Sequence, residues 1–221
     1  MTELLSFSDV VVPLRGQIRG GPWTFSLPTG TGAALRASPS VADAVARLCA
    51  GALAPEKGTV LVLGQCPYHL PRNDRNRLLR RVGISFQREG LVSNLSLEDN
   101  LTVPMLFGGH CSPTEARTRA SQAMVELGLD AYRALRPGAL ARETRILAVL
   151  ARAALRGPEL MILEHLSSGL GDRLARRALS WCRDRCRSML VLVPGPSAVL
   201  DDLAFEWLSP ISVEEGEVGR E

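Results

Sequence analysis

Lysine is almost absent from this sequence of 221 residues: Lys57 is the only one, and 25 of the 26 basic residues are arginine. Any site that requires a lysine ammonium must therefore use Lys57 or do without one. The three histidines have no metal-ligand spacing, and the five cysteines form no C-x-x-C pair. We therefore expect reduced thiols and no metal centre.

Long apolar runs are also missing. No stretch approaches the ~20 apolar residues that cross a bilayer, and no charged-then-apolar secretory signal opens the chain. Aromatic residues make up 5% of the chain, and none is interleaved with the arginines as in surfaces that stack nucleic-acid bases. We expect a cytoplasmic, soluble chain that does not bind nucleic acid.

What is present is the pattern of an α/β protein, with 46% apolar residues for a sizeable core. The first part predicts two antiparallel strands over 4–12 and 23–27, joined by a Gly-rich loop. Strands and helices then alternate, which predicts a mostly parallel sheet. The further strands are expected at 33–36, 60–63, 82–85, 160–163 and 189–193, and the helices within 37–51 and at 72–81, 113–127, 145–155 and 172–187.

The stretch 157–172 carries the strongest functional signal. A short apolar strand ends at Glu164 and His165, at the kind of strand end where open α/β sheets place their chemistry. A Ser-Ser-Gly turn and a helix follow. This layout resembles the Walker B strand and D-loop of ATP-binding-cassette (ABC) proteins, in which D-E-P-T-S-G-L-D follows the apolar residues. The resemblance implies that Glu164 and His165 replace the catalytic aspartate and glutamate.

A second resemblance covers 37–51 and the turn at 55–58. The family has the Walker A pattern G-P-S-G-S-G-K-S-T here, opening a helix that ends in A-G. A P-x-x-G turn then follows, as it does in this sequence. The resemblance implies nucleotide-binding positions at Ser38, Pro39, Ser40 and Asp43.

The chemistry of that segment has nevertheless changed. A phosphate-binding loop needs glycines so that successive amides can converge on the anion, yet none lies between Ala37 and Ala50. Lys57 comes too late to serve as the loop lysine. A carboxylate at Asp43 would repel a phosphate by about 4 kcal/mol at ~4 Å and an effective dielectric of about 20.

The segment 84–105, ISFQREGLVSNLSLEDNLTVPM, resembles the Q-loop region of ABC ATPases and is the best preserved motif. In that family the glutamine touches Mg²⁺ and the attacking water, and the following residues meet the membrane permease. The wording is most similar to the ATPase subunits of MCE/Mla-type phospholipid transporters. The resemblance thus implies a catalytic-type position at Gln87 and a docking surface made of Gln87, Leu91, Asn94, Leu95, Asp99 and Asn100.

Residues 136–155 resemble the family's signature motif, P-x-x-L-S-G-G-Q, and its helix. The motif presents a hydroxyl, glycine amides and a helix N-terminus to the γ-phosphate across a dimer interface. Here S-G-G-Q is altered and Glu143 brings a negative charge. The implied nucleotide-facing positions are Leu140, Ala141, Arg142 and Glu143, together with Pro194 where the family has its switch histidine.

The resemblance covers nearly the whole chain and implies its fold class. This is a P-loop NTPase-like ABC ATPase fold of the α/β class, with a mostly parallel core sheet, an antiparallel N-terminal β-subdomain and an inserted α-helical subdomain. We expect one domain over 1–221, with the helical subdomain at about 90–156 and an acidic tail at 214–221.

ABC ATPases pair head to tail, so each ATP lies between one chain's Walker A and the other's signature. Since both motifs are altered here, an active partner chain would share two impaired sites. The leading hypothesis is therefore a non-catalytic subunit with a structural or regulatory role in a phospholipid or other envelope transport complex. Its partners would be an integral-membrane permease and a second ABC ATPase chain, in a homo- or heterodimer at the inner face of the cytoplasmic membrane.

No cofactor is expected; ATP with Mg²⁺ would bind only if the altered site still accepts it. One alternative is a weak ATPase, active only with its partner, in which His165 serves as a neutral base near pH 7 beside Glu164. Another is an arginine-rich anion-binding module, whose binding would depend steeply on salt. The transported substrate, the permease and the type of dimer stay open.

Overall fold

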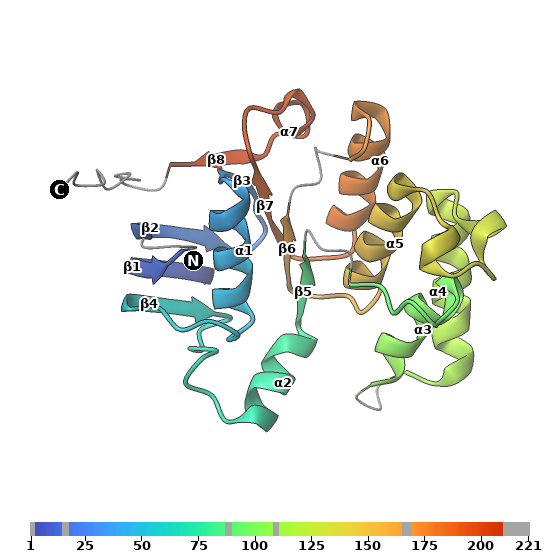
Figure 1. The fold of residues 1–221 in the computed structure, drawn as a ribbon, viewed down its shortest axis with the longest axis horizontal. Helices are drawn as coiled ribbons and strands as arrows, with labels where there is room; N and C mark the ends of the chain where they lie inside the picture. The colour runs from blue at the N-terminus through green and yellow to red at the C-terminus, as the bar shows by residue number, and fades with distance from the viewer. Residues whose placement is uncertain (1–2, 15–17, 87–89, 108–110, 165–168, 210–221) are drawn as a thin grey trace.

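The computed structural model describes residues 3–14, 18–86, 90–107, 111–164 and 169–209. Within them, a five-stranded sheet of order β5-β6-β7-β3-β8 has only parallel pairings. Its strands are β3 (Gly32–Arg36), β5 (Val82–Ser85), β6 (Leu160–Glu164), β7 (Ser188–Val193) and β8 (Glu206–Leu208). A three-stranded antiparallel sheet of order β2-β1-β4 lies beside it (Figure 1). Its strands are β1 (Glu3–Pro13), β2 (Arg19–Pro28) and β4 (Lys57–Val62).

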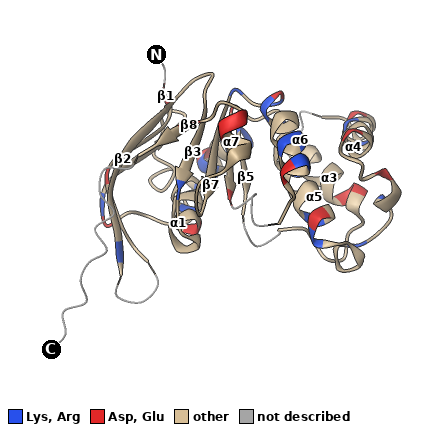
Figure 2. Ribbon diagram, turned by 90° about the horizontal axis from the view of Figure 1, so that it is seen from above, with Lys and Arg blue, Asp and Glu red and all other residues tan. Residues whose placement is uncertain are grey.

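Helices surround the parallel sheet and continue beyond it. They are α1 (Pro39–Cys49), α2 (Arg72–Arg80), α3 (Leu97–Leu106), α4 (Pro113–Leu127), α5 (Arg142–Ala154), α6 (Asp172–Arg183) and α7 (Ala198–Asp202). Two 3₁₀ turns, η1 (Asp130–Tyr132) and η2 (Pro137–Ala139), connect α4 to α5. Seen from above, β1 and β2 occupy one end of the molecule, and α3, α4 and α5 the other (Figure 2). The predicted fold class is confirmed.

The core divides at the parallel sheet because successive side chains of a strand point to opposite faces. Leu160 and Ile162 of β6 pack with α1 and the antiparallel sheet, whereas Met161 and Leu163 pack with α5 and α6. Every residue of β6 is buried, as expected for a strand covered on both faces. The apolar run that predicted this strand therefore reflects its place at the centre of the fold.

The antiparallel sheet confirms the two predicted N-terminal strands. Phe7 and Phe25 stack across the β1–β2 pair with ring centroids 4.4 Å apart. The strand predicted at 60–63 begins earlier, at Lys57, because the P-x-x-G turn is part of its pairing with β1. Gly58 has φ +79° there, and a Cβ on it would lie 2.3 Å from the Asp9 carbonyl oxygen. Glycine is therefore required for this close approach.

The helices that were predicted differ from the observed ones mainly at their ends, and α3 and α7 were not predicted. Helix α5 begins at Arg142 instead of residue 145, and α6 ends at Arg183 instead of residue 187. Helix α4 has the expected bounds because Ser112 and Glu115 form a capping box and Gly128 ends it in the left-handed conformation. Among the described residues, no helix combines the length and the apolar content that crossing a membrane requires.

Candidate functional site

The carboxyl ends of four neighbouring strands meet at one edge of the parallel sheet. Arg36 at the end of β3 pairs with Val193 at the end of β7, and Glu164 at the end of β6 pairs with Leu192. Ser85 at the end of β5 pairs with Leu163 of β6. The register therefore brings the segments after β3, β5, β6 and β7 to the same edge, as expected for a site in an open α/β sheet.

A cleft of about 940 Å³ opens at this edge. Several residues that the sequence had placed at nucleotide-binding or catalytic positions line it together: Pro39, Ser40, Asp43 and Glu164. Its other lining residues are Pro13, Leu14, Ala44, Arg47, Leu53 and Phe86. The volume lies near the upper end of the range of small-molecule sites.

The N-terminus of α1 faces this cleft and is capped by its own chain. The Ser38 hydroxyl accepts a hydrogen bond from the Val41 amide at 3.4 Å and lies 3.1 Å from the Ser40 hydroxyl. Pro39, at the first helical position, has no amide hydrogen to donate. The Val41 amide hydrogen is therefore already bound by a side-chain oxygen, and it is one of the amides that a bound anion would otherwise use.

Two acidic residues line the cleft, Asp43 and Glu164. Asp43 is exposed and lies 3.6 Å from the Arg47 guanidinium one helical turn later. Glu164 is only 5% exposed at the end of β6. The two other predicted catalytic-type positions, Gln87 and His165, lie outside the described residues. Pro194 is exposed directly after β7 and is not among the residues that line the cleft.

The signature-like segment lies elsewhere on the same chain, at the start of α5. Ala141 caps the helix with no side-chain hydrogen bond, and Arg142 and Glu143 are exposed in its first turn. Gly169 packs against this turn: a Cβ on it would lie 2.3 Å from Ile146. None of these residues lines the cleft of its own chain.

Leu140 has a different role from a nucleotide contact. Its side chain is 4% exposed and belongs to the core cluster under α5. The expectation that it faces a ligand is therefore wrong for its side chain, because burial leaves it no accessible face. Leu140 anchors the segment that positions the exposed Arg142 and Glu143.

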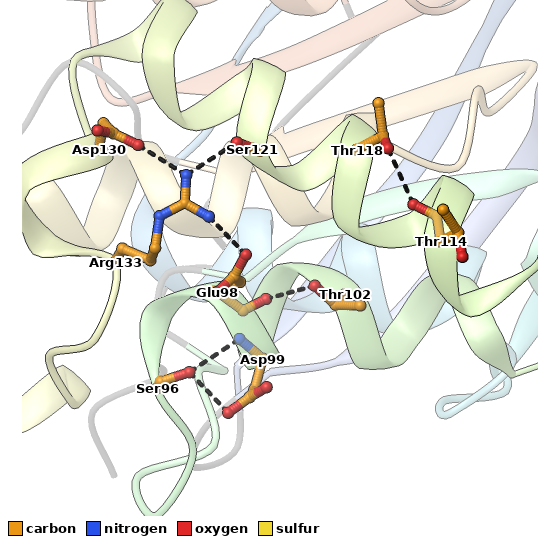
Figure 3. A network of polar contacts seen from close by, with 9 residues as sticks. All are labelled: Ser96, Glu98, Asp99, Thr102, Thr114, Thr118, Ser121, Asp130 and Arg133. Atoms are coloured by element: carbon orange, nitrogen blue, oxygen red, sulfur yellow. Dashed lines mark hydrogen bonds and ion pairs between the residues drawn. The ribbon is translucent and has the colours of Figure 1, made fainter.

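The surface after Gln87 is formed by the loop 90–96 and the first turns of α3. Asn94 and Asp99 are exposed on it, and Leu91 and Leu95 are half-buried. Asp99 is held in place because Ser96 caps α3: its hydroxyl accepts from the Asp99 amide at 3.0 Å and donates to the Asp99 carboxylate at 2.6 Å (Figure 3). The two hydrogen bonds to Ser96 thus fix the position of the exposed Asp99 side chain.

Asn100 organises this loop from the inside and does not offer its side chain to a partner. It is 1% exposed. Its Oδ1 accepts from the Val92 amide at 2.7 Å, and its Nδ2 donates to the carbonyls of Ser96, Val92 and Leu95 at 2.9, 3.1 and 3.3 Å. The prediction of a direct docking contact is therefore wrong for Asn100, since the loop backbone uses its polar atoms.

Arg133 ties the same region to α4 (Figure 3). Its guanidinium donates to Glu98 at 2.6 Å, to Asp130 at 2.7 Å and to the Ser121 hydroxyl at 2.8 Å. Farther along the chain, Arg152 of α5 donates to the Gly90 carbonyl. The Arg133 contacts connect α3 to α4, and the Arg152 contact connects the loop 90–96 to α5.

A model of the ABC transporter family matches residues 44–165, which is more than half of the chain. The chain belongs to the ABC transporter family. The matched part starts directly after Asp43, so it leaves out the predicted nucleotide-binding positions at the start of α1, and it ends at His165. It includes the loop 90–96, α3 and the signature-like start of α5.

Curated relatives are ATP-binding proteins of this ABC family. The chain is 27% identical over 176 residues to the methionine import ATP-binding protein MetN 2 of Paraburkholderia xenovorans, covering 78% of this chain and 44% of the relative. It is 29% identical over 140 residues to the phosphonates import ATP-binding protein PhnC of Alcaligenes faecalis, covering 60% and 51%. It is 32% identical over 117 residues to the macrolide export ATP-binding/permease protein MacB of Acinetobacter baylyi, covering 52% and 18%. The chain thus spans about half the length of these relatives or less.

Solved structures of ABC cassettes share the fold. The dimeric structure of MJ0796, a bacterial ABC transporter cassette, has a TM-score of 0.76 at 17% identity, covering 87% of this chain and 88% of that one. The cbiO1 protein of Clostridium perfringens has a TM-score of 0.72 at 15% identity, covering 88% and 80%. At these identities the likeness establishes the fold.

Several residues of the ABC-type cleft were not predicted from the sequence. Pro13 and Leu14 come from the end of β1 and Leu53 follows α1, so a long-range arrangement brings them together. Arg47 had a local signal, since it lies one helical turn after Asp43. The buried role of Asn100 had none, because nothing in its sequence neighbourhood distinguishes a loop-organising asparagine from an exposed one.

Proposed function

We propose that this chain is a non-catalytic subunit of an ABC transport system that docks on a membrane permease. The observation that carries the proposal is the N-terminus of α1, where the family binds phosphate. Its first turn contains no glycine, and the Ser38 hydroxyl accepts from the Val41 amide. The resemblance of residues 84–105 to the region that the family uses for docking supports the second part of the proposal.

The residues of the cleft do not fit MgATP. A triphosphate carries several negative charges and needs converging amides and a cation. The cleft instead offers the Asp43 carboxylate and the buried Glu164. Among the described residues that line it, the single cation is Arg47, which lies 3.6 Å from Asp43. The start of the family match at Ala44 supports the same conclusion, since the segment before it has diverged.

The altered start of α5 extends the argument to a dimer. Arg142 and Glu143 are exposed there, so they would face whatever lies against this helix end. If this chain pairs head to tail with a second ABC chain, one composite site has the altered α1 and the other has the altered α5. Both sites are then impaired, which favours a structural or regulatory role over shared catalysis.

Docking is supported by the surface after Gln87. Leu91, Asn94, Leu95 and Asp99 lie on or near a loop that Asn100 holds from within. Such an ordered surface costs little entropy to bind. The proposed location is the inner face of the cytoplasmic membrane, against a permease.

The proposed cargo is a phospholipid or another envelope component. This rests on the wording of residues 84–105 alone. The relatives named above are, by name, methionine, phosphonate and macrolide transport proteins. We do not propose any of these substrates as the cargo of this chain. The proposed class of cargo can be tested by deleting the gene and measuring the phospholipid composition of the cell envelope.

Phosphate release from MgATP tests the lack of catalysis. The chain should release none above the blank, whereas MetN 2 of Paraburkholderia xenovorans, assayed in parallel, provides the active control. The second candidate function, a weak ATPase, is favoured by the burial of Glu164 at the cleft. It requires release that disappears in both Glu164→Gln and His165→Ala, and that result would refute the proposal.

Docking is tested by co-purification with candidate ABC permeases from the same organism. Val92 and Asn94 are exposed on the loop, so Val92→Glu and Asn94→Arg should abolish co-purification without lowering the melting temperature. Val125→Glu on α4 is the matched control, because Val125 is also an exposed apolar residue but lies outside this surface. Unchanged binding by both loop variants would contradict the docking surface.

A further inference from the structure

A second pocket, of about 360 Å³, lies away from the ABC-type cleft. It is at the opposite end of the parallel sheet, since Arg81 and Glu159 directly precede β5 and β6 whereas Glu164 ends β6. Segments from α2, the end of α3, α4 and the connection from α5 to β6 surround it. Its lining residues are Arg77, Arg80, Arg81, Met105, Phe107, Cys111, Arg119, Arg156, Gly157 and Glu159.

The pocket has five arginines and a single carboxylate, although the whole chain has nearly equal numbers of basic and acidic residues. That carboxylate, Glu159, is already bound to Arg81 at 2.6 Å. Arg77 is paired with Asp74 at 3.1 Å. For the other three arginines, Arg80, Arg119 and Arg156, no ion pair within 4 Å is found in the described part of the chain.

Helix ends explain part of this arrangement. Arg80 is in the last turn of α2 and Arg156 follows α5, and a helix C-terminus favours positive charge. Arg119 lies in the middle of α4, one helical turn after Glu115, and no helix-end effect applies there. The hydrogen bond from the Ser112 backbone is the main cause of the lowered pKa of Glu115, and the charge of Arg119 contributes to it. Helix dipoles therefore do not account for the convergence on one pocket of three guanidinium groups that have no carboxylate within 4 Å among the described residues.

The convergence is unfavourable in the absence of an anion. Burial lowers the pKa of Arg156, and the charge of the nearby Arg80 lowers it further. Both effects disfavour the charged form. The apolar side of the pocket, with the buried Met105 and the largely exposed Phe107, supplies no compensating charge. A bound anion would relieve the repulsion and pair with the guanidinium groups of Arg80, Arg119 and Arg156.

We propose that this pocket binds a phosphate-bearing anion through Arg80, Arg119 and Arg156. Planar guanidinium forks match phosphate oxygens and bind them in bidentate fashion. The volume suits a small phosphorylated group. The phosphate could belong to a free molecule or to a lipid headgroup. Because Arg119 is on α4 while Arg80 and Arg156 flank β5 and β6, the anion would also bridge the α3–α4 helices to the sheet.

This inference is independent of the proposed function, because it uses none of the residues of the ABC-type cleft. The test is calorimetric titration of the full chain with inorganic pyrophosphate at constant ionic strength. We expect saturable binding that weakens about tenfold or more in Arg119→Gln and in Arg156→Gln, as each loses a charge-assisted contact. Arg117→Gln is the matched control on the same helix, outside the pocket, and should bind like the unchanged chain.

A second arm identifies the source of the phosphate. Co-sedimentation with phosphatidylcholine vesicles, with and without phosphatidylglycerol, reports binding to lipid headgroups. Binding to the anionic vesicles that is lost in Arg119→Gln and Arg156→Gln supports a headgroup site, and binding to pyrophosphate alone supports a free ligand. The melting temperature of unliganded Arg156→Gln should not fall, since the change removes like-charge repulsion.

Three results would overturn the proposal. The first is the absence of saturable binding in both arms. The second is binding that survives Arg119→Gln and Arg156→Gln, which would place the anion elsewhere, for example at the start of α1. The third is an equal loss in Arg117→Gln, which would indicate attraction to overall charge instead of a site.

Discussion

Replacing Asn100 by leucine should destabilise the loop 90–96 and the chain as a whole. Leucine is close to asparagine in shape but cannot form hydrogen bonds. The Val92 amide would lose the Asn100 Oδ1 at 2.7 Å, and the Leu95 carbonyl would lose the Asn100 Nδ2 at 3.3 Å. The carbonyls of Val92 and Ser96 keep backbone partners, because they also accept from the amides of Leu95 and Asn100.

The expected loss follows from these two backbone groups. Each lost hydrogen bond costs about 1 kcal/mol, and leaving its partner unsatisfied in a site that is 1% exposed raises the cost to about 1–3 kcal/mol. Since Val92 itself is 47% exposed and its amide can reach water, we take the lower half of that range for each. The total is about 2–4 kcal/mol, or a fall in melting temperature of roughly 4–16 °C for a chain of this length.

Urea unfolding measures this difference directly. The midpoint for Asn100→Leu should fall while the slope m stays the same, because the surface exposed on unfolding is unchanged. Asn94→Leu is the control: Asn94 is exposed, and surface changes usually cost less than about 0.5 kcal/mol. A loss in Asn100→Leu no larger than in this control would refute the assignment of Asn100 as the organiser of the loop 90–96.

Three further predictions concern other contacts. The hydrogen bond from Arg81 lowers the pKa of Glu159, so the pair stabilises the fold above the unfolded pKa of about 4.3 and this contribution is lost as the pH falls. Glu159→Gln should therefore lower stability by about 0.2–1 kcal/mol in urea titrations at pH 7 and leave it unchanged at low pH; a loss that persists in acid would contradict this. Burial raises the pKa of the Cys49 and Cys182 thiols. A thiol-specific disulfide reagent at pH 8 should therefore modify neither thiol in the native chain and both in denaturant. Rapid labelling of either thiol in the native chain would contradict its burial in the core. Glu126→Gln should lower the melting temperature by about 2–8 °C, because its carboxylate accepts at 2.6 Å from both Trp181 of α6 and Arg185, which follows α6. An unchanged melting temperature would count against this contact between α4 and the end of α6.

Much of the fold was predictable because its central strands are apolar runs. The strand at 160–163 could be placed from its buried pattern and the Gly-Pro before it, and the carboxyl-end rule then located Glu164 correctly at the cleft. Helix α3 was not predicted. It contains Pro104 and has no clear polar face, so neither periodicity nor propensity indicated it.

Other features depend on contacts that sequence reasoning does not reach. Helix α5 begins at Arg142 although Ala141 supplies no capping side chain, so the usual start signal was missing. The burial of Leu140 and Asn100 follows from packing against distant segments. The arginine-lined pocket gathers residues from four separate segments between Arg77 and Glu159, and only the three-dimensional arrangement shows that three of its arginines have no ion pair within 4 Å in the part of the chain that the structure describes.

The central claim is that the cassette fold of this chain has been retained without nucleotide binding. Calorimetric titration of the purified full chain with MgATP, up to millimolar nucleotide, tests it most directly, with MetN 2 of Paraburkholderia xenovorans as the positive control. The account predicts no saturable heat and no nucleotide-dependent rise in melting temperature. Saturable binding that is weakened by Ser40→Glu at the start of α1 would contradict it and make Glu164 the first residue to test for catalysis.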